Sequence, residues 1–215
     1  MTSLPERIVL ATANEHKVAE IRQILPMINF VARPADVSDV IEDAGTLVGN
    51  ARLKADAICA ATGLPALADD TGLFVDALGG EPGVETAYFA GPEANADRNV
   101  AKMLQALDGQ TNRAALFVTV ALLRFADGSE IVAQGEVLGV VATQRLGSSG
   151  FGYDPIFVPN DGDGRAFAEM TADEKATISH RARAMKSLAE MLGAALPVAQ
   201  VDVPHVYNRA VASDD

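Results

Sequence analysis

The spacing of hydrophobic residues along the first hundred positions alternates between a strand pattern and a helix pattern. Residues 8–11 form an apolar run of strand length, and Asn14 then precedes a segment with apolar residues on one helical face. A second helical pattern, residues 46–61, begins at residue 46 or 48 and leads to residues 65–70, a short apolar run that ends in two aspartates. Helical spacing returns over residues 95–107. This order of patterns indicates strands that alternate with helices.

The middle of the chain changes to longer apolar runs separated by turn residues. Residues 79–83 are rich in glycine and contain a proline, so this segment is predicted to be irregular. Residues 114–125 and 130–142 are apolar and partly β-branched, and the Asp127-Gly128 pair between them is typical of a tight hairpin. An antiparallel part of the sheet is therefore expected here.

The C-terminal part begins with a short strand, residues 156–158, and continues with helices. Thr171 and Glu174 have the spacing of a capping box, and a further helix is predicted from residue 179 or 180 to residue 196. These patterns together predict an α/β protein with a mixed sheet and flanking helices. Residues 197–215 mix valine with proline and polar residues, and we expect this C-terminal extension to be partly disordered.

Charge and cysteine content narrow the class of partner. The chain has 215 residues and a formal charge of -12, and no run of lysine or arginine interrupts the acidic field, so nucleic acid is not expected as a partner. Cys59 is the only cysteine, and the N-terminal segment fits neither a signal peptide nor a membrane span. A cytoplasmic protein without membrane contact is predicted, and a small anionic ligand remains compatible with a few cations gathered in one cleft.

The first segment with candidate chemistry is residues 12–17, "TANEHK", between the first strand and the first helix. Free N–H groups at a helix start, the favourable end of the helix dipole and Lys17 in the first turn together suit a triphosphate. The segment is not a Walker A loop, because the spacing "GxxxxGK[ST]" is absent. A capped helix with a solvated Lys17 is the alternative explanation.

The second candidate is the acidic pair at the end of the strand in residues 65–70. Carboxylates at a strand's end are natural ligands for Mg²⁺, and adjacent strand residues point to opposite faces, so one of Asp69 and Asp70 is expected to meet a metal directly. Glu42 or Asp43 could add a second carboxylate. A solvated turn is the alternative, and the acidic loop at residues 160–164 lacks the ligand spacing of a calcium-binding hand and is predicted to be a plain turn.

Two further segments could contact a base or phosphates. Residues 150–154, "GFGYD", place Phe151 and Tyr153 in a glycine-rich loop, where either ring could stack on a base or anchor the loop to the core. Lys175, His180 and Arg181 lie at or near two predicted helix starts, where cations oppose the helix dipole, so a ligand contact competes with a solvated charged face as the explanation.

The segments in this order resemble the inosine triphosphate pyrophosphatase family, whose members remove deaminated purine triphosphates. The resemblance runs through "IVLATANEHKVAEI", "GNARLKA", "LPALADDTGLFVDALGGEPGV", "GFGYDPIF" and "FAEMTADEKATISHRARAMK", and it covers nearly all of residues 8–192. It implies an elongated mixed β-sheet with two lobes around a central substrate cleft, a single domain over residues 1–196, and a homodimer. Gly49 stands where a glutamate is usual in the family.

The resemblance also implies roles for individual residues. Asp70 would be the general base and, with Glu42, would bind Mg²⁺ as the cofactor. The substrate, a purine nucleoside triphosphate such as ITP, dITP or XTP, would be contacted by Thr12, Ala13, Asn14, Glu15, His16, Lys17, Thr71, Phe151, Gly152, Tyr153, Asp154, Lys175, His180 and Arg181. Hydrolysis between the α and β phosphates would give the monophosphate and pyrophosphate. The alternatives are a pyrophosphatase of broader or pyrimidine preference and a nucleotide-binding regulator without turnover.

Overall fold

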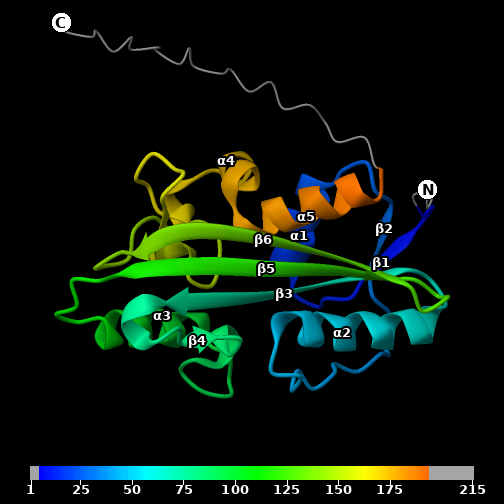
Figure 1. Ribbon diagram of the computed structural model, residues 1–215, viewed down its shortest axis with the longest axis horizontal. Coiled ribbons are helices and arrows are strands. Elements are labelled where there is room, and N and C mark those ends of the chain that lie inside the picture. The colour runs from blue at the N-terminus through cyan, green and yellow to red at the C-terminus, as the bar shows by residue number, and fades with distance from the viewer. Residues whose placement is uncertain (1–4, 194–215) are drawn as a thin grey trace, which may run out of the picture.

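The computed structural model describes residues 5–193 as a seven-stranded mixed sheet flanked by helices (Figure 1). The strands are β1 (Ile8–Leu10), β2 (Phe30–Val31), β3 (Ala66–Val75), β4 (Pro82–Gly83), β5 (Ala114–Arg124), β6 (Glu130–Val141) and β7 (Phe157–Pro159). The α-helices are α1 (Glu15–Ile24), α2 (Leu47–Thr62), α3 (Ala96–Ala106), α4 (Ala172–Ile178) and α5 (His180–Met191). Short 3₁₀ turns cover Asp76–Leu78, Thr86–Tyr88, Asp154–Ile156 and Phe167–Glu169.

The strands lie in the order β2-β1-β3-β5-β6-β7, with β4 paired to the end of β3. β1 is parallel to β2 and β3, whereas β3, β5, β6 and β7 pair antiparallel. The predicted α/β class with a mixed sheet is therefore confirmed, and the Asp127-Gly128 hairpin joins β5 to β6 as expected.

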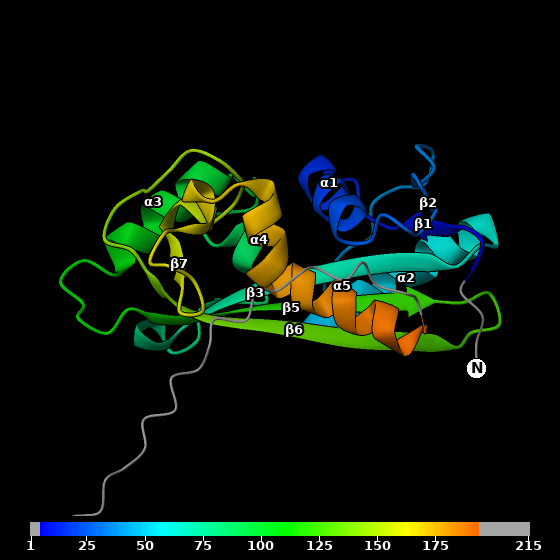
Figure 2. The same ribbon diagram turned by 90° about the horizontal axis from the view of Figure 1, so that it is seen from above.

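At one end of the molecule, helices α1, α2 and α5 cover both faces of the sheet, and α3 lies at the other end (Figures 1 and 2). α1 and α5 pack on one face of the sheet, and α2 packs on the opposite face against β3 and β5. At the far end, α3 and the segments around β7 enclose a separate apolar cluster that includes Met103, Phe117 and Phe157. The long strands β5 and β6 run through both ends and join them, which gives the elongated two-lobed form.

Most helix boundaries follow the predicted signals. The side chain of Asn14 caps α1, that of Thr46 caps α2, and Gly63 ends α2 in the left-handed conformation. Thr171 and Glu174 form the predicted capping box at the start of α4. These local hydrogen bonds need no tertiary partner, which is why the sequence alone locates them.

Two predicted boundaries and one segment expected to be irregular are wrong. β3 does not end at the aspartate pair but continues to Val75, because it pairs with β5 along its whole length. Pro82–Gly83 forms the short strand β4 within the segment expected to be irregular. α5 ends at Met191 rather than at residue 196, and Gly193 adopts a left-handed φ of 67° just beyond it. The expected C-terminal extension, residues 197–215, lies outside the described residues.

The unequal lengths of β1 and β3 open one edge inside the sheet. β1 pairs with β3 only as far as Leu10 and Leu67, while β3 continues for eight further residues. Beyond this point β3 has β5 on one side and no β1 residue on the other, and Asp69 and Asp70 lie there. No helix within residues 5–193 is long and apolar enough to cross a membrane.

Candidate active site

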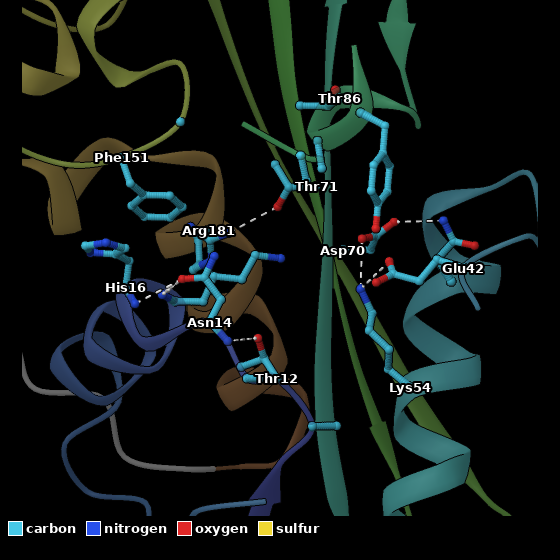
Figure 3. Close-up of a pocket in the computed structure, with 18 of the residues that line it drawn as sticks. Thr12, Asn14, His16, Glu42, Lys54, Asp70, Thr71, Thr86, Phe151 and Arg181 are labelled. Atoms are coloured by element: carbon cyan, nitrogen blue, oxygen red, sulfur yellow. Dashed lines mark hydrogen bonds and ion pairs between the residues drawn. The ribbon is translucent and has the colours of Figure 1, made fainter. Parts of the chain in front are cut away.

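A cleft of about 560 Å³ opens at this interrupted edge, a volume typical of small-ligand sites (Figure 3). Segments far apart in the sequence meet around it: the loop before α1, the loop before α2, β3, the loop at residues 151–154, the last turn of α4 and the start of α5. Of the residues expected to act on a substrate, the cleft lining includes Thr12, Ala13, Asn14, His16, Lys17, Glu42, Asp70, Thr71, Phe151, Gly152, Tyr153, Asp154, Lys175, His180 and Arg181. Glu15 is absent from the lining, and its side chain is exposed.

The two aspartates of β3 point to opposite faces of the sheet, as the period of a strand requires. Asp69 faces α1 and α5, where it contacts Lys17 and Arg181. Asp70 faces α2, where it contacts Asn50 and Lys54. The expectation that the two side chains point to opposite faces is confirmed, and the expectation that only one of them meets a metal directly stays a prediction.

On the α2 face, a lysine lies between two carboxylates. The Lys54 Nζ is 2.8 Å from Glu42 Oε2 and 2.9 Å from Asp70 Oδ1 (Figure 3). Asn50 is buried and donates its Nδ2 to Asp70 Oδ2 at 3.3 Å, while its Oδ1 accepts from the Ala44 backbone N–H. Asn50 therefore ties Asp70 to the loop that carries Glu42.

Sequence reasoning missed Lys54 and Asn50. The available signal was their i, i+4 spacing in the predicted helix, which places both side chains on one face. Sequence reasoning also left Glu42 and Asp43 as alternatives for the second metal carboxylate. Glu42 lines the cleft, whereas Asp43 is exposed and does not line it. Gly49 allows the loop to approach α2, since a Cβ there would lie 2.5 Å from the Ala44 Cβ.

The pKa values of Asp70 and Lys54 on this face are shifted from their usual values. Burial raises the pKa of the Asp70 carboxyl, and the neighbouring Lys54 ammonium only partly opposes this shift. Burial acts to lower the pKa of Lys54, but the carboxylates of Asp70, Asp69 and Glu42 outweigh it and raise the pKa. Lys54 therefore stays charged, and Asp70 becomes a stronger base than an exposed aspartate.

On the opposite face, Arg181 joins two acidic groups. Its Nε and Nη2 donate to Asp69 Oδ2 at 3.1 and 2.9 Å, its Nη1 donates to Glu20 Oε2 at 2.5 Å, and its Nη2 also donates to Thr71 Oγ1 at 3.2 Å. Lys17 Nζ lies 3.1 Å from the same Asp69 oxygen. Burial acts to raise the pKa of Asp69, but Lys17 and Arg181 outweigh it and hold this pKa well below its usual range.

This arrangement corrects the expectation for Arg181. A solvated or cleft-exposed side chain was expected, whereas the side chain is only 2% exposed and uses four of its five N–H donors inside the protein. Glu20, which sequence reasoning missed, also accepts from Lys175 Nζ at 2.7 Å. One carboxylate of α1 thus holds a cation from each of the two C-terminal helices.

The loop before α1 is more fully capped than expected. Asn14 Oδ1 accepts from the N–H groups of His16 and Lys17 at 3.0 and 3.3 Å, and Thr12 Oγ1 accepts from Asn14 N. Two of the helix-start N–H groups that were expected to be free are therefore satisfied by the cap. Lys17 remains directed to the cleft, where its pKa is lowered by burial despite the attraction of Asp69.

The two aromatic residues of the 150–154 loop have different environments. The Tyr153 ring is buried and its hydroxyl donates to the Thr86 carbonyl at 3.0 Å, so Tyr153 anchors the loop. The Phe151 ring lines the cleft and stacks on His16, with ring centroids 5.2 Å apart and an interplanar angle of 13° (Figure 3). Asp154 accepts from the Phe151 N–H and from Lys175 Nζ, which fixes the loop against α4.

The helix-start argument for the basic residues holds for two of the three. His180 and Arg181 are the first residues of α5, but Lys175 lies in the last turn of the short α4, where its charge agrees with the dipole. His180 is buried, its Nδ1 lies 2.6 Å from Thr119 Oγ1, and its ring stacks on Phe117 at 4.4 Å. Burial and the nearby cations lower the pKa of His180 well below its usual range, so its imidazole is neutral.

Comparison with known proteins agrees with this architecture. Residues 8–191 match the sequence profile of the Ham1 family. The chain belongs to the Ham1 family. The family membership expected from the motifs is confirmed, and the match spans every element that lines the cleft.

This chain aligns with Ham1-family relatives and solved structures over nearly the whole length of those proteins. The dITP/XTP pyrophosphatase of Flavobacterium johnsoniae is 42% identical over 191 residues, which is 87% of this chain and 98% of the relative. The dITP/XTP pyrophosphatase of Deinococcus deserti is 44% identical over 198 residues, 92% of this chain and 94% of the relative. A solved HAM1 protein from Coxiella burnetii superposes with a TM-score of 0.79 at 37% identity, covering 87% of this chain and 98% of that one.

Proposed function

We propose that this protein hydrolyses deaminated purine nucleoside triphosphates, namely ITP, dITP and XTP, to the monophosphate and pyrophosphate. The observation that carries the proposal is the pair of carboxylates, Glu42 and Asp70, facing Lys17 and the helix start of α1 across one cleft. Relatives at 42 and 44% identity are named dITP/XTP pyrophosphatases, which supports the same activity here.

Mg²⁺ is the cofactor that the site supports. Within the described residues no three His, Cys, Asp or Glu side chains converge as a ligand group, but Mg²⁺ binds through one or two carboxylates and keeps several waters. Glu42 and Asp70 fit this donor set, since they already hold a cation, the Lys54 ammonium, between them. Bound Mg²⁺ would supply charge neutralisation on the triphosphate and polarise nearby water.

The chain's own residues then account for the hydrolysis. Asp70 orients a water and takes its proton, and the pKa raised by burial strengthens it as a base. The water oxygen bonds to the α-phosphorus as the bond from this phosphorus to the bridging oxygen breaks, and pyrophosphate leaves with that oxygen. Lys17, together with Lys54 once it leaves the two carboxylates, would stabilise the negative charge on the phosphates.

The base would bind near Phe151. Its ring offers a stacking surface, Lys175 and Arg181 lie near that ring, and His180 lines the same cleft. Donors from these residues would favour an oxo group at the purine 6-position over the amino group of adenine. Asp154 and Tyr153 are assigned to holding the loop that carries Phe151. A small nucleotide is favoured over nucleic acid because the chain carries a charge of -12.

The activity is tested with a substrate panel. Purified protein with Mg²⁺ is given ITP, XTP, dITP, GTP, ATP and dTTP, and the products are separated to distinguish monophosphate plus pyrophosphate from diphosphate plus phosphate. ITP and XTP are expected to be converted fastest and to release pyrophosphate, and Asp70→Asn is expected to be inactive while remaining folded. Equal rates on dTTP would favour the broader pyrophosphatase, and nucleotide binding without turnover would favour the regulator.

We also propose a cytoplasmic homodimer. The only cysteine, Cys59, is a buried free thiol, which suits a reducing compartment. The outer face of β6 exposes Leu138 and Val140, at 62 and 40% of their surface, which suits burial against a second copy.

A further inference from the structure

Three neighbouring strands and the first turn of α5 meet at one row of the sheet. Thr71 of β3 lies opposite Thr119 of β5, which lies opposite Gly135 of β6. A Cβ on Gly135 would be 2.1 Å from the His180 carbonyl oxygen, so the absence of a side chain lets α5 begin directly against this row. His180 is thereby brought to Thr119.

The hydroxyl groups of this row connect Arg181 to His180. Arg181 Nη2 lies 3.2 Å from Thr71 Oγ1, Thr71 Oγ1 lies 2.7 Å from Thr119 Oγ1, and Thr119 Oγ1 lies 2.6 Å from His180 Nδ1. Thr119 is fully buried, so no solvent competes for its hydroxyl. The four side chains form one continuous hydrogen-bonded chain.

The direction of this chain follows from its first member. A guanidinium can only donate, so the Thr71 oxygen accepts from Arg181 and its own hydrogen is available for Thr119. Thr119 then donates its hydroxyl hydrogen bond to His180 Nδ1, and every donor in the row has an acceptor. In the reverse direction Thr71 would accept from both Arg181 and Thr119, and its own hydrogen would have no acceptor among the described residues.

The other ring nitrogen of His180 is open to the cleft. Within residues 5–193, Nε2 makes no hydrogen bond. The atom is not fully buried, so solvent in the cleft reaches it. A neutral imidazole carries one hydrogen, and an accepting Nδ1 places it on Nε2. Nε2 is then a donor exposed to the cleft.

We infer that Thr119 is a positioning residue for specificity: it fixes His180 as the Nε2–H tautomer and so directs a hydrogen-bond donor at an oxo group of the substrate base. The opposite tautomer would offer a lone pair, which suits the amino group of adenine. This inference rests on the proposed function for its consequence for selectivity, whereas the tautomer itself is a property of the free protein.

The test compares Thr119→Val, which keeps the shape and removes the hydroxyl, with Thr119→Ser, which keeps the hydroxyl. The ¹⁵N shifts of the His180 ring are recorded on the full chain, which has three histidines, and are assigned by their loss in His180→Asn. Wild type and Thr119→Ser should show an unprotonated Nδ1 and a protonated Nε2. Thr119→Val should show the two shifts averaging toward each other as both tautomers become populated. Melting temperatures establish that each variant is folded.

The kinetic arm measures the ratio of kcat/KM for ITP to that for ATP. Thr119→Val should lower this ratio about tenfold, the effect of one hydrogen bond, and Thr119→Ser should change it less than about twofold. A protonated Nδ1 in the wild type, unchanged shifts in Thr119→Val, or altered shifts with an unchanged ratio would each overturn the inference. Absence of ITP hydrolysis in the wild type would refute the proposed function, and the ¹⁵N shifts would still decide the tautomer.

Discussion

Lys54 occupies a place that a divalent cation would also occupy. Its ammonium contacts Glu42 and Asp70 at once, and removing it would leave two carboxylates that repel each other in a partly buried position. If Glu42 and Asp70 bind Mg²⁺ as proposed, Lys54 and Mg²⁺ would compete for the same carboxylates before the nucleotide binds, and a triphosphate would offer Lys54 another anionic partner.

We expect Lys54→Met to bind Mg²⁺ more tightly than the wild type when no nucleotide is present, by roughly tenfold, or about 1.4 kcal/mol. The reason is that the variant lacks the competing ammonium. Isothermal titration with Mg²⁺ alone measures the affinity, and Lys54→Arg, which keeps the charge, is the matched control. Weaker Mg²⁺ binding by Lys54→Met would contradict the competition. The turnover of Lys54→Met should fall, because the variant loses a contact to the phosphates.

The burial of Arg181 leads to a different prediction from that for an exposed cleft residue. Arg181→Ala removes one of two cations from each of Asp69 and Glu20 and leaves only Lys17 and Lys175 beside them, so the free energy of unfolding should fall by about 3–5 kcal/mol. Urea denaturation followed by circular dichroism measures the loss.

Arg183, two residues along α5, offers the matched control for Arg181. It pairs with Asp161 at the surface, with both side chains more than a third exposed, and Arg183→Ala should cost about 0.5 kcal/mol or less. Similar losses for the two variants would mean that the buried ion pairs do not distinguish Arg181.

At the scale of elements, the contact of α5 with β6 determines where His180 and Arg181 lie. Gly135 sits beneath the first turn of α5, and an added Cβ would also be 2.3 Å from the Ala184 backbone nitrogen. These atoms belong to a helix backbone, which cannot move aside as a flexible side chain can.

Gly135→Ala should therefore lift the start of α5 from the sheet, lower the free energy of unfolding by about 1–3 kcal/mol, and weaken the Thr119–His180 hydrogen bond. Thermal unfolding and the His180 ¹⁵N shifts measure the two effects. Gly162→Ala is the control, because Gly162 is exposed in a turn and a Cβ there would lie 3.2 Å from the nearest atom, in the Pro159 side chain. Wild-type stability and shifts in Gly135→Ala would show that the close approach is dispensable.

At the scale of the molecule, the two faces of the sheet are covered unequally. α5 covers β6 on one face, whereas on the other face α2 packs mainly on β3 and β5 and meets β6 near its start, where Arg52 pairs with Glu130. Alternate β6 residues from Gln134 to Val140 are exposed. Leu138 and Val140 are the apolar members of this row and are exposed within residues 5–193. The proposed second copy would cover this surface.

Leu138→Glu should convert the proposed dimer to a monomer, because it places a charge in the apolar surface formed by Leu138 and Val140. Sedimentation velocity measures the mass in solution. Met191→Glu is the control, since Met191 is also an exposed hydrophobic residue, at 57%, but lies on α5. A wild-type monomer, or a Leu138→Glu dimer of unchanged affinity, would reject this interface.

The sequence by itself determined the local elements and the pieces of the site. Asn14, Thr46 and Thr171 cap helices through hydrogen bonds to residues two or three positions away, so their effect can be read from short segments. The motifs also identified the family, and the period of two predicted that Asp69 and Asp70 would separate to opposite faces.

Only the tertiary structure decided how those pieces are paired. Arg181 reaches Asp69 and Glu20 over sequence separations of more than a hundred residues, and Thr119, which has no motif of its own, meets His180 only because β3, β5 and β6 are in register beneath α5. Burial follows from the same packing, and burial is what turned Arg181 from a solvated cation into an internal ion pair and kept His180 neutral. Spacing along the chain carries no record of these contacts, because they arise from which faces of distant elements come together.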